Sequence, residues 1–209
     1  MYISRAYKVD DKKEIHHFMQ THYFATLITQ NEEGPWGTHV PILLDADVGK
    51  YGTLIGHFAR ANPQRHMLTQ EVEALAIFQG PHAYISPSWR EIQEHDDAPT
   101  WDYAVVHAYG RPRLVEDERR LYDLLVRTIT YTERHHEQPW TLKMSLDEAR
   151  PQMRGIVGFE MEIMRLEGNF KLGQRRSQTD KERIYRHLMR RNDQQDRLLA
   201  EMMKTHVMG

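Results

Sequence analysis

The sequence contains no cysteine in its 209 residues. This absence excludes disulfides, thiolate metal sites, CxxC redox chemistry and a cysteine nucleophile. The sequence also lacks any run of ~18 apolar residues, which is the length that a transmembrane helix needs. Its first residues, MYISR, are followed by charged residues and do not resemble a secretory signal. We therefore expect a cytoplasmic protein with no membrane partner.

Several catalytic motifs are missing as well. No GxGxxG or P-loop supports a nucleotide-binding fold, and no HExxH spacing supports a zinc site. The adjacent pairs His16-His17 and His135-His136 do not form metal sites, because neighbouring side chains on a helix diverge by ~100°. Asp102 and His107 could form an acid–base pair, but no nucleophile elbow accompanies them. The sequence predicts no catalytic residue and no metal ligand.

Hydrophobic residues make up 40% of the chain and charged residues 28%, which is enough apolar material for a packed core. From position 171 onward there are ten basic and five acidic residues, which gives this segment a formal charge of +5. Because the whole chain has a formal charge of −2, the first 170 residues carry −7. Such a segment indicates either contact with a polyanion or docking on the acidic body. We expect docking, because its apolar residues fall near one helix face: Ile184, Leu188, Leu198, Leu199, Met202 and Met203.

The first half of the chain is typical of a meander of antiparallel strands with short connections. A short helix capped by Asp10 or Asp11 precedes β-rich runs at 24–29, 38–44, 51–58 and 74–78. Pro41 lies inside the second run and lacks a hydrogen-bond donor, so it indicates a sheet edge, a bulge or a ligand-facing position. Gly80-Pro81 is expected to break the last of these strands before residues 82–85 continue it.

The second half adds helices between the later strands. Strands are expected at 105–115 and 156–166, and a helix at 117–135. Capping boxes begin a short turn at Ser145 and a C-terminal helix at Thr179, which Asn192-Asp193 interrupts. Six or seven strands with inserted helices predict an α+β fold built on a closed or nearly closed antiparallel barrel.

Residues 57–63, HFARANP, bring a histidine, an arginine and a helix start together where a strand ends. A guanidinium offers two parallel donors to a phosphate, and a helix start offers free N–H groups. His57, Arg60 and Asn62 are therefore candidates for an anion cradle. The alternative is a polar strand end followed by an ordinary Asn-Pro helix cap.

Residues 80–89, GPHAYISPSW, place aromatic rings beside hydroxyls and prolines. This suits a planar ligand with polar edges, although such rings are also common in cores and interfaces. Residues 86–102 then show no strand or helix pattern, and a loop of that length is usually functional or mobile. The loop holds Trp89 and Trp101, and its acidic residues are Glu91, Glu94, Asp96, Asp97 and Asp102.

Five segments in this order, GHFARANPQ, FQGPHAYISPSW, PTWDYAVVHAYG, RGIVGFEMEI and KLGQRRSQTD, closely resemble the PaiB family over essentially the whole chain. That family is described as FMN-binding negative transcriptional regulators with a flavin-type split β-barrel. The resemblance implies a homodimer, with a split barrel at 1–170 and a basic helical segment at 171–209 packed on it. It also implies control of sporulation and degradative-enzyme genes.

The resemblance further implies that FMN lies in a cleft at the dimer interface. The phosphate end corresponds to His57, Arg60 and Asn62. The strand beside the flavin ring corresponds to Thr38, His39, Val40 and Pro41. The second wall, lent by the other subunit, corresponds to Ser86, Trp89, Trp101 and Tyr103.

The chain differs from the family pattern at several positions. It has Trp89-Arg90 in place of Trp-Tyr, Trp101-Asp102-Tyr103 in place of Trp-Asn-Tyr, and Gly173-Gln174-Arg175 in place of Ser-Gln-Asn. Asp97-Ala98 stands where a Lys usually precedes Pro-Thr-Trp. Asp102 and the missing Lys make the cleft less favourable to a phosphate, whereas Arg90 and Arg175 offset this loss.

The sequence leaves other functions open. The chain shows no helix-turn-helix or zinc finger, so direct contact with DNA would rely on the basic C-terminal region or on a groove across the dimer. A flavin-dependent reductase or oxidase needs no dedicated acid or base, because the cofactor carries the hydride chemistry. A split barrel that acts without a ligand, through protein contacts, is the third alternative.

Overall fold

The computed structural model describes residues 1–69, 71–91 and 98–208. Seven strands form one sheet in the order β1-β7-β4-β3-β2-β5-β6, and β6 additionally pairs with β7. This additional pairing joins two strands that are far apart in the order, so the sheet closes into a barrel. β1 pairs with β7, β2 with β3 and β5, and β4 with β3 and β7, all antiparallel. The predicted α+β fold with an antiparallel barrel is confirmed.

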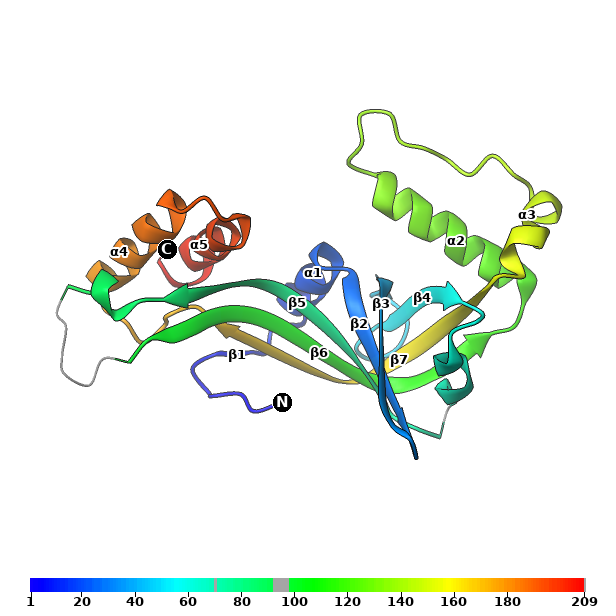
Figure 1. Cartoon of the computed structure of the whole chain (residues 1–209), viewed down its shortest axis with the longest axis horizontal. Helices are drawn as coiled ribbons and strands as arrows, with labels where there is room; N and C mark the ends of the chain where they lie inside the picture. Colours follow the sequence, from blue (N-terminus) through cyan, green and yellow to red (C-terminus); the bar gives the residue numbers. More distant parts are fainter. Residues whose placement is uncertain (70, 92–97, 209) are drawn as a thin grey trace. The chain divides into compact units, whose positions relative to one another are not determined.

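Figure 1 shows the elements along the chain. The strands are β1 (Lys8–Val9), β2 (Phe24–Asn31), β3 (Gly34–Asp45), β4 (Thr53–Ala59), β5 (Ala74–Ile85), β6 (Thr100–Val115) and β7 (Ile156–Lys171). The α-helices are α1 (Lys12–Thr21), α2 (Glu118–Glu133), α3 (Leu146–Met153), α4 (Gln178–Arg190) and α5 (Gln194–Val207). Two short 3-10 helices are η1 (Pro63–Met67) and η2 (Pro87–Trp89). None of the described helices combines the length and apolar character that a membrane crossing requires.

The chain forms two compact units, and β5, β6 and β7 each supply residues to both. The first unit consists of residues 1–11, 79–106 and 167–209. The second unit consists of residues 12–78 and 107–166.

In the second unit, β2 and β3 form a hairpin whose register runs from Asn31–Gly34 at the turn to Phe24–Pro41. Its turn is short because Gly34 adopts a φ of 123°, which side chains disfavour. Side chains alternate between the two faces of each strand, so one face supplies the apolar core. Its fully buried members include Leu27, Leu54, Phe78, Phe159 and Met161.

Helix α2 covers part of this unit through its apolar stripe. Leu124 packs with Leu43 and Ile55, and Tyr131 adds its ring to the same cluster. The Tyr131 hydroxyl donates to the Gln20 carbonyl at 2.6 Å, which fixes the end of α2 near α1. The capping box predicted at Ser145 is confirmed, with the Ser145 and Glu148 side chains each bonded to the other residue's backbone N–H.

In the first unit, β1 pairs with the end of β7, with Lys8 opposite Asn169. Helices α4 and α5 contact each other, and Ile184, Leu188, Leu199 and Met203 are fully buried. The two helices therefore share a buried apolar interior, and the docking of this segment on the barrel stays a prediction. Leu198, however, is 43% exposed, so the apolar face predicted from the sequence was wrong at that position.

Other corrections concern element boundaries. β5 runs through Gly80-Pro81 without a break, because proline removes only one donor and its φ suits extended backbone. β6 begins at Thr100, inside the segment expected to lack structure. Within that segment Glu94, Asp96 and Asp97 lie outside the described residues.

The C-terminal helix is two helices. Asp193 caps α5, as the expected interruption at Asn192-Asp193 indicated. The cap of α4 is Ser177 instead of Thr179, since the Ser177 side chain accepts from the Asp180 N–H.

Leu188 on α4 and Leu198 on α5 differ in burial and therefore provide a matched pair of variants. Leu188→Ala should lower the free energy of unfolding by about 2–5 kcal/mol, because it removes a fully buried side chain and leaves a cavity. Leu198→Ala should change it much less, because Leu198 is 43% exposed and its loss leaves no enclosed cavity. Urea unfolding at one protein concentration measures both values. Equal losses in the two variants would contradict the assignment of faces.

Candidate functional site

One edge of β3 stays outside the sheet ladder over residues 34–41. β2 pairs with β3 along this stretch, whereas the register with β4 begins only at Ile42, opposite Gly56. The Ile42 N–H donates to the Tyr23 carbonyl at 2.7 Å, toward the β2 side. Because backbone groups of a strand alternate between its edges, the N–H and C=O groups of Gly37 and His39 point to the open edge. This edge can therefore hydrogen-bond a ligand.

Pro41 stands directly before the point where pairing with β4 begins. The sheet edge that its missing donor predicted is therefore confirmed at this position. Val40 is buried and faces the interior of the barrel, while His39 is exposed. The His39 ring is held from the neighbouring strand, since its Nδ1 lies 2.8 Å from the Thr26 hydroxyl.

Thr38 and Asn62 are brought together by β3 and the start of η1. Asn62 Nδ2 donates to the Thr38 Oγ1 at 2.8 Å, and its Oδ1 accepts from the Gln64 N–H at 3.0 Å. The second bond is the Asn-Pro helix cap that the sequence offered as the alternative to an anion cradle. The cap is present, and the same amide also fixes the hydroxyl beside the open edge.

Gln64 is a residue that the sequence analysis missed. Its side chain is fully buried and its Nε2 donates to the Leu27 carbonyl at 3.0 Å, the Thr29 hydroxyl at 3.1 Å and the Trp36 carbonyl at 3.3 Å. These bonds hold η1 against both strands of the hairpin. Its Oε1 is buried and has no hydrogen-bond partner among the described residues. The available signal was its place in GHFARANPQ, directly after the cap.

His57 lies on β4 opposite Gly158 of β7. Its Nδ1 is buried and makes no hydrogen bond to the described residues. Burial lowers the pKa of the His57 imidazole, so the ring is held neutral. A neutral imidazole can donate or accept at this atom according to its tautomer.

Arg60 follows β4 and turns its guanidinium toward the start of β7. Its Nε donates to the Arg154 carbonyl at 2.8 Å and its Nη2 to the Ile156 carbonyl at 2.9 Å. The side chain lines a cavity of about 370 Å³ together with Arg150 and Arg154. Arg60 therefore holds backbone at the same time as it adds positive charge to this end of β4. These two bonds go to the start of β7 and not to Thr38 or Asn62.

The remaining four predicted residues lie in the first unit. Ser86 caps η2 and its hydroxyl lies 2.8 Å from that of Ser88, while Tyr103 accepts a bond of 3.3 Å from the Asn169 amide. Trp101 is 54% exposed and lies about 6 Å from the rings of His82 and Tyr84. These three rings form an aromatic group on β5 and β6.

Trp89 is held by two residues of α4, one turn apart, and by the C-cap residue of that helix. Its ring stacks on that of His187 at 5.1 Å, its carbonyl accepts from Arg183 Nε at 2.9 Å, and Arg191 lies 5.8 Å from its ring. Trp89 is thus packed against α4, and Arg183 belongs to this contact instead of to an exposed basic face.

The first unit contains a cavity of about 420 Å³, which we call the basic cavity. It is lined by Tyr7, Arg90, Thr100, Asp102, Lys171, Gly173, Arg175, Arg176, Ser177 and Asp180. Four of these positions, Arg90, Asp102, Gly173 and Arg175, are among those at which the chain differs from the family pattern. Asp102 is fully buried and bonded to Arg176, so it does not serve as a free catalytic acid with His107.

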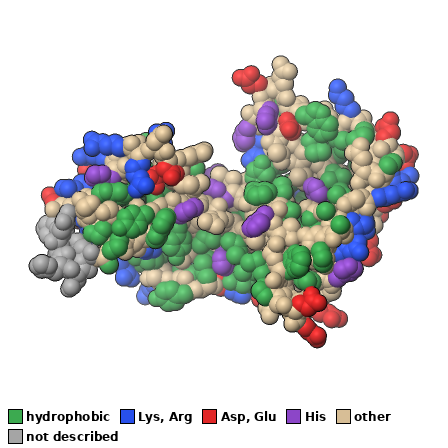
Figure 2. All heavy atoms as spheres, in the orientation of Figure 1, with side chains coloured by type: hydrophobic (Ala, Val, Ile, Leu, Met, Phe, Trp, Pro, Cys, Tyr) green, Lys and Arg blue, Asp and Glu red, His purple; other side chains and the backbone are tan. Residues whose placement is uncertain are grey.

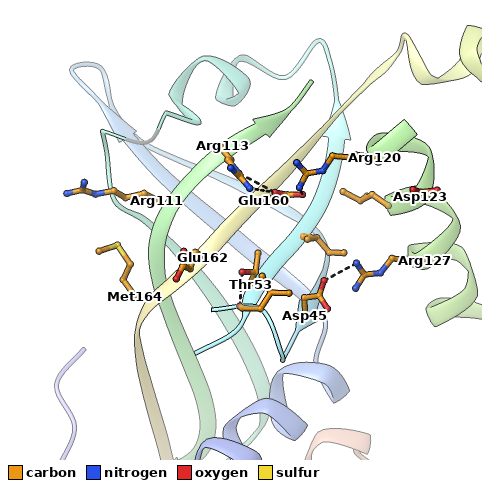
Figure 3. Close-up of a pocket in the computed structure, with 13 residues that line it drawn as sticks. Asp45, Thr53, Arg111, Arg113, Arg120, Asp123, Arg127, Glu160, Glu162 and Met164 are labelled. Atoms are coloured by element: carbon orange, nitrogen blue, oxygen red, sulfur yellow. Dashed lines mark hydrogen bonds and ion pairs between the residues drawn. The ribbon is translucent and has the colours of Figure 1, made fainter. Parts of the chain in front are cut away.

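A cavity of about 690 Å³ lies in the second unit and was not predicted. Figure 3 shows Glu160 of β7 between Arg113 of β6 and Arg120 of α2, and Arg127 of α2 bonded to Asp45. Arg111 extends on the other side of this group. The signal in the sequence was the alternation of Arg111 and Arg113 on one strand face. The arginines and carboxylates that line this cavity largely neutralise one another.

Comparison with known proteins gives the chain a family and a fold relationship. A family model described as "Putative FMN-binding domain" matches residues 1–165. The chain is 33% identical over 206 residues to "Protease synthase and sporulation protein PAI 2" of Bacillus subtilis (strain 168). The aligned region covers 98% of this chain and 97% of that protein.

Two solved structures share the fold at low identity. A flavocytochrome from Azotobacter vinelandii has a TM-score of 0.61 at 10% identity and covers 81% of this chain and 72% of its own. An FAD and heme binding protein from Mycobacterium smegmatis has a TM-score of 0.60 at 10% identity and covers 78% of this chain and 73% of its own. The fold, the matched domain and the full-length identity agree: the chain belongs to this FMN-binding domain family and is a homologue of the Bacillus subtilis PAI 2 protein, as its resemblance to the PaiB family implied.

Proposed function

We propose that this protein is a dimeric regulator of transcription that binds FMN as its signal. The observation that carries the flavin part is the open edge of β3 over residues 34–41, beside the Thr38–Asn62 hydrogen bond. A flavin ring carries donors and acceptors along its edge, and the backbone groups of Gly37 and His39 offer partners for them. The regulatory part rests on the homology to a protein named for protease synthesis and sporulation.

The residues present fit a flavin. Thr38, His39, Val40 and Pro41 form the strand next to the ring, and the orphaned Nδ1 of His57 supplies a further polar contact from β4. Arg60 and the Asn62 amide supply positive and polar groups at the phosphate end. A charge-assisted bond from a guanidinium to a phosphate is about twice as strong as a neutral one.

A second copy completes the site in this proposal. Ser86, Trp89, Trp101 and Tyr103 belong to the unit that contains the ends of β5 and β6. The 54% exposure of Trp101 and 39% exposure of Tyr84 leave an aromatic surface that interfaces commonly bury. We infer that this aromatic group covers the flavin of the partner subunit.

DNA would meet the exposed basic side chains of α4 and α5. Figure 2 shows Lys and Arg side chains gathered over these two helices. Arg186, Arg190 and Arg197 are exposed there. Non-specific contacts of this kind bind phosphates without reading sequence, so their affinity depends steeply on salt.

Flavin binding is tested with FMN and riboflavin, which differ by the phosphate. Arg60→Ala should weaken FMN binding about tenfold or more and leave riboflavin binding nearly unchanged, because only the phosphate loses a charge-assisted bond. Absorption and fluorescence titrations measure both affinities. Arg119→Ala, on the polar face of α2, is the control and should bind both flavins as the parent does.

Equal losses for the two flavins would show that Arg60 acts only through its bonds to the Arg154 and Ile156 carbonyls. Absence of any spectral change on adding FMN would overturn the flavin proposal. Rapid bleaching of bound FMN by reduced nicotinamide nucleotide would favour the flavin-dependent oxidoreductase instead of the regulator.

The dimer is tested with two exposed tryptophans. Light scattering should give the mass of a dimer at micromolar concentration. Trp101→Ala should shift it toward the monomer and weaken FMN binding, because a large aromatic surface is lost from the interface. Trp140→Ala removes a side chain of nearly the same exposure, 55%, outside the proposed interface and should leave both unchanged. A monomeric parent protein would contradict the proposal.

DNA contact is tested by anisotropy of a labelled duplex over a salt series. Replacing Arg190 and Arg197 by Gln should reduce the slope of log K against log salt by about 2, since each neutralised phosphate contributes about 0.9. Arg119→Gln serves as the matched control. No binding by the parent protein at low salt would exclude direct contact through this surface.

A further inference from the structure

The basic cavity contains more positive than negative side chains. Arg90, Lys171, Arg175 and Arg176 line it together with Asp102 and Asp180. Four cations against two carboxylates leave a formal charge of +2 within about 420 Å³. Like charges held this close repel one another, so an excess of this size favours a bound counter-ion.

Asp102 is already neutralised by its own partners. Arg176 places Nη1 at 2.5 Å and Nη2 at 3.5 Å from the two oxygens of this fully buried carboxylate. Lys171 Nζ lies 3.7 Å from the same group and also donates to the Thr100 hydroxyl. Asp102 therefore consumes the charge of Arg176 and part of that of Lys171.

Asp180 is satisfied in the same way. It accepts from the Glu91 N–H at 2.9 Å and lies 3.5 Å from Arg90 Nε. Burial of Asp180 raises its pKa, but the bonds from Glu91, Ser177 and Arg90 outweigh burial and hold the pKa below its ordinary value. The carboxylate is thus ionised and occupied, and it adds little repulsion toward a second anion.

Of the cations that line the basic cavity, Arg175 is held least tightly by neighbouring residues. Its Nη2 lies 3.4 Å from the Ser4 hydroxyl and its guanidinium 5.8 Å from the Tyr7 ring, and the side chain is exposed. A guanidinium has five N–H donors, so one long bond leaves most of them available. The 13-residue helix α4 begins at the same cavity with its cap Ser177, and a helix start adds partial positive charge.

We propose that the basic cavity binds the phosphate group of a small phosphomonoester, at a site separate from the one proposed for flavin. A phosphate dianion matches the +2 excess, and its oxygens match the fork of Arg175 geometrically. The cavity volume exceeds that of phosphate and lies within the range of small-ligand sites, which leaves room for the organic part. None of the eleven residues assigned to flavin lines this cavity. From the sequence, we expected Arg90 and Arg175 beside the flavin phosphate, but the structure gathers them with Lys171 and Arg176, so we assign them to a site of their own. This inference does not rest on flavin binding.

The test is calorimetric titration of the full-length protein at low ionic strength with inorganic phosphate and with glycerol 3-phosphate. Arg175→Gln should weaken both at least about tenfold, and Arg175→Lys should recover part of the loss because it keeps the charge. Arg119→Gln is the control: it removes an exposed arginine from the polar face of α2, outside this cavity, and should bind as the parent does.

Three outcomes would overturn the proposal. The parent protein could fail to bind either phosphate, or Arg119→Gln could lose as much affinity as Arg175→Gln, which would indicate non-specific attraction. FMN could displace phosphate while riboflavin does not, which would show that the cavity holds the flavin phosphate itself. Phosphate binding that persists with FMN saturated supports a separate site.

Discussion

Closure of the barrel depends on a close approach of β6 and β7. At Gly110 a Cβ atom would lie 2.1 Å from the Glu162 carbonyl oxygen, so only glycine permits the two strands to come this near. The pairing of β6 with β7 closes the sheet on itself, so most of its strands have a neighbour on both sides. The stretch of β3 over 34–41 remains open on one side, and it carries the backbone groups that the candidate site uses.

Buried polar side chains set the position of that open stretch. Gln64 ties η1 to the carbonyls of Leu27 and Trp36, and Asn62 ties it to the Thr38 hydroxyl. Because these bonds are made in surroundings with little water, breaking one of them leaves a desolvated polar group behind. The hairpin and the start of η1 therefore behave as one structural element, although 26 residues separate Thr38 from Gln64 in the chain.

Local signals in the sequence were sufficient for most of the elements and for part of the site. Asn62-Pro63 and Ser145 to Glu148 mark helix starts because a cap is decided by a few adjacent residues. Pro41 marked the edge of β3 because a missing donor has the same meaning in any sheet. The strand break predicted at Gly80-Pro81 was wrong for the opposite reason. Pairing along β5 is decided by strands distant in the sequence, and these keep the backbone extended through both residues.

Long-range charge pairing lay beyond the sequence. Nothing near Asp102 indicates that its partner is Arg176, 74 positions later. Glu160 likewise meets arginines 47 and 40 positions earlier, and only the folded strands bring them together. The family resemblance assigned residues to both walls of the proposed flavin site, but not the contacts that each of them makes. Arg60, for example, was expected to face a phosphate, and its guanidinium donates to the carbonyls of Arg154 and Ile156 where β7 begins.

The packing of Trp89 against α4 makes this indole an optical probe of the helix. Arg183 and His187 contact Trp89 from successive turns of α4, and Arg191 does so from its C-cap. An imidazole stacked at 8° to the indole plane is well placed to quench its emission. Any event that shifts α4 along its axis must change the partner of the indole and hence its emission. The protein therefore carries its own fluorescent label at the point where η2 meets the basic C-terminal helices.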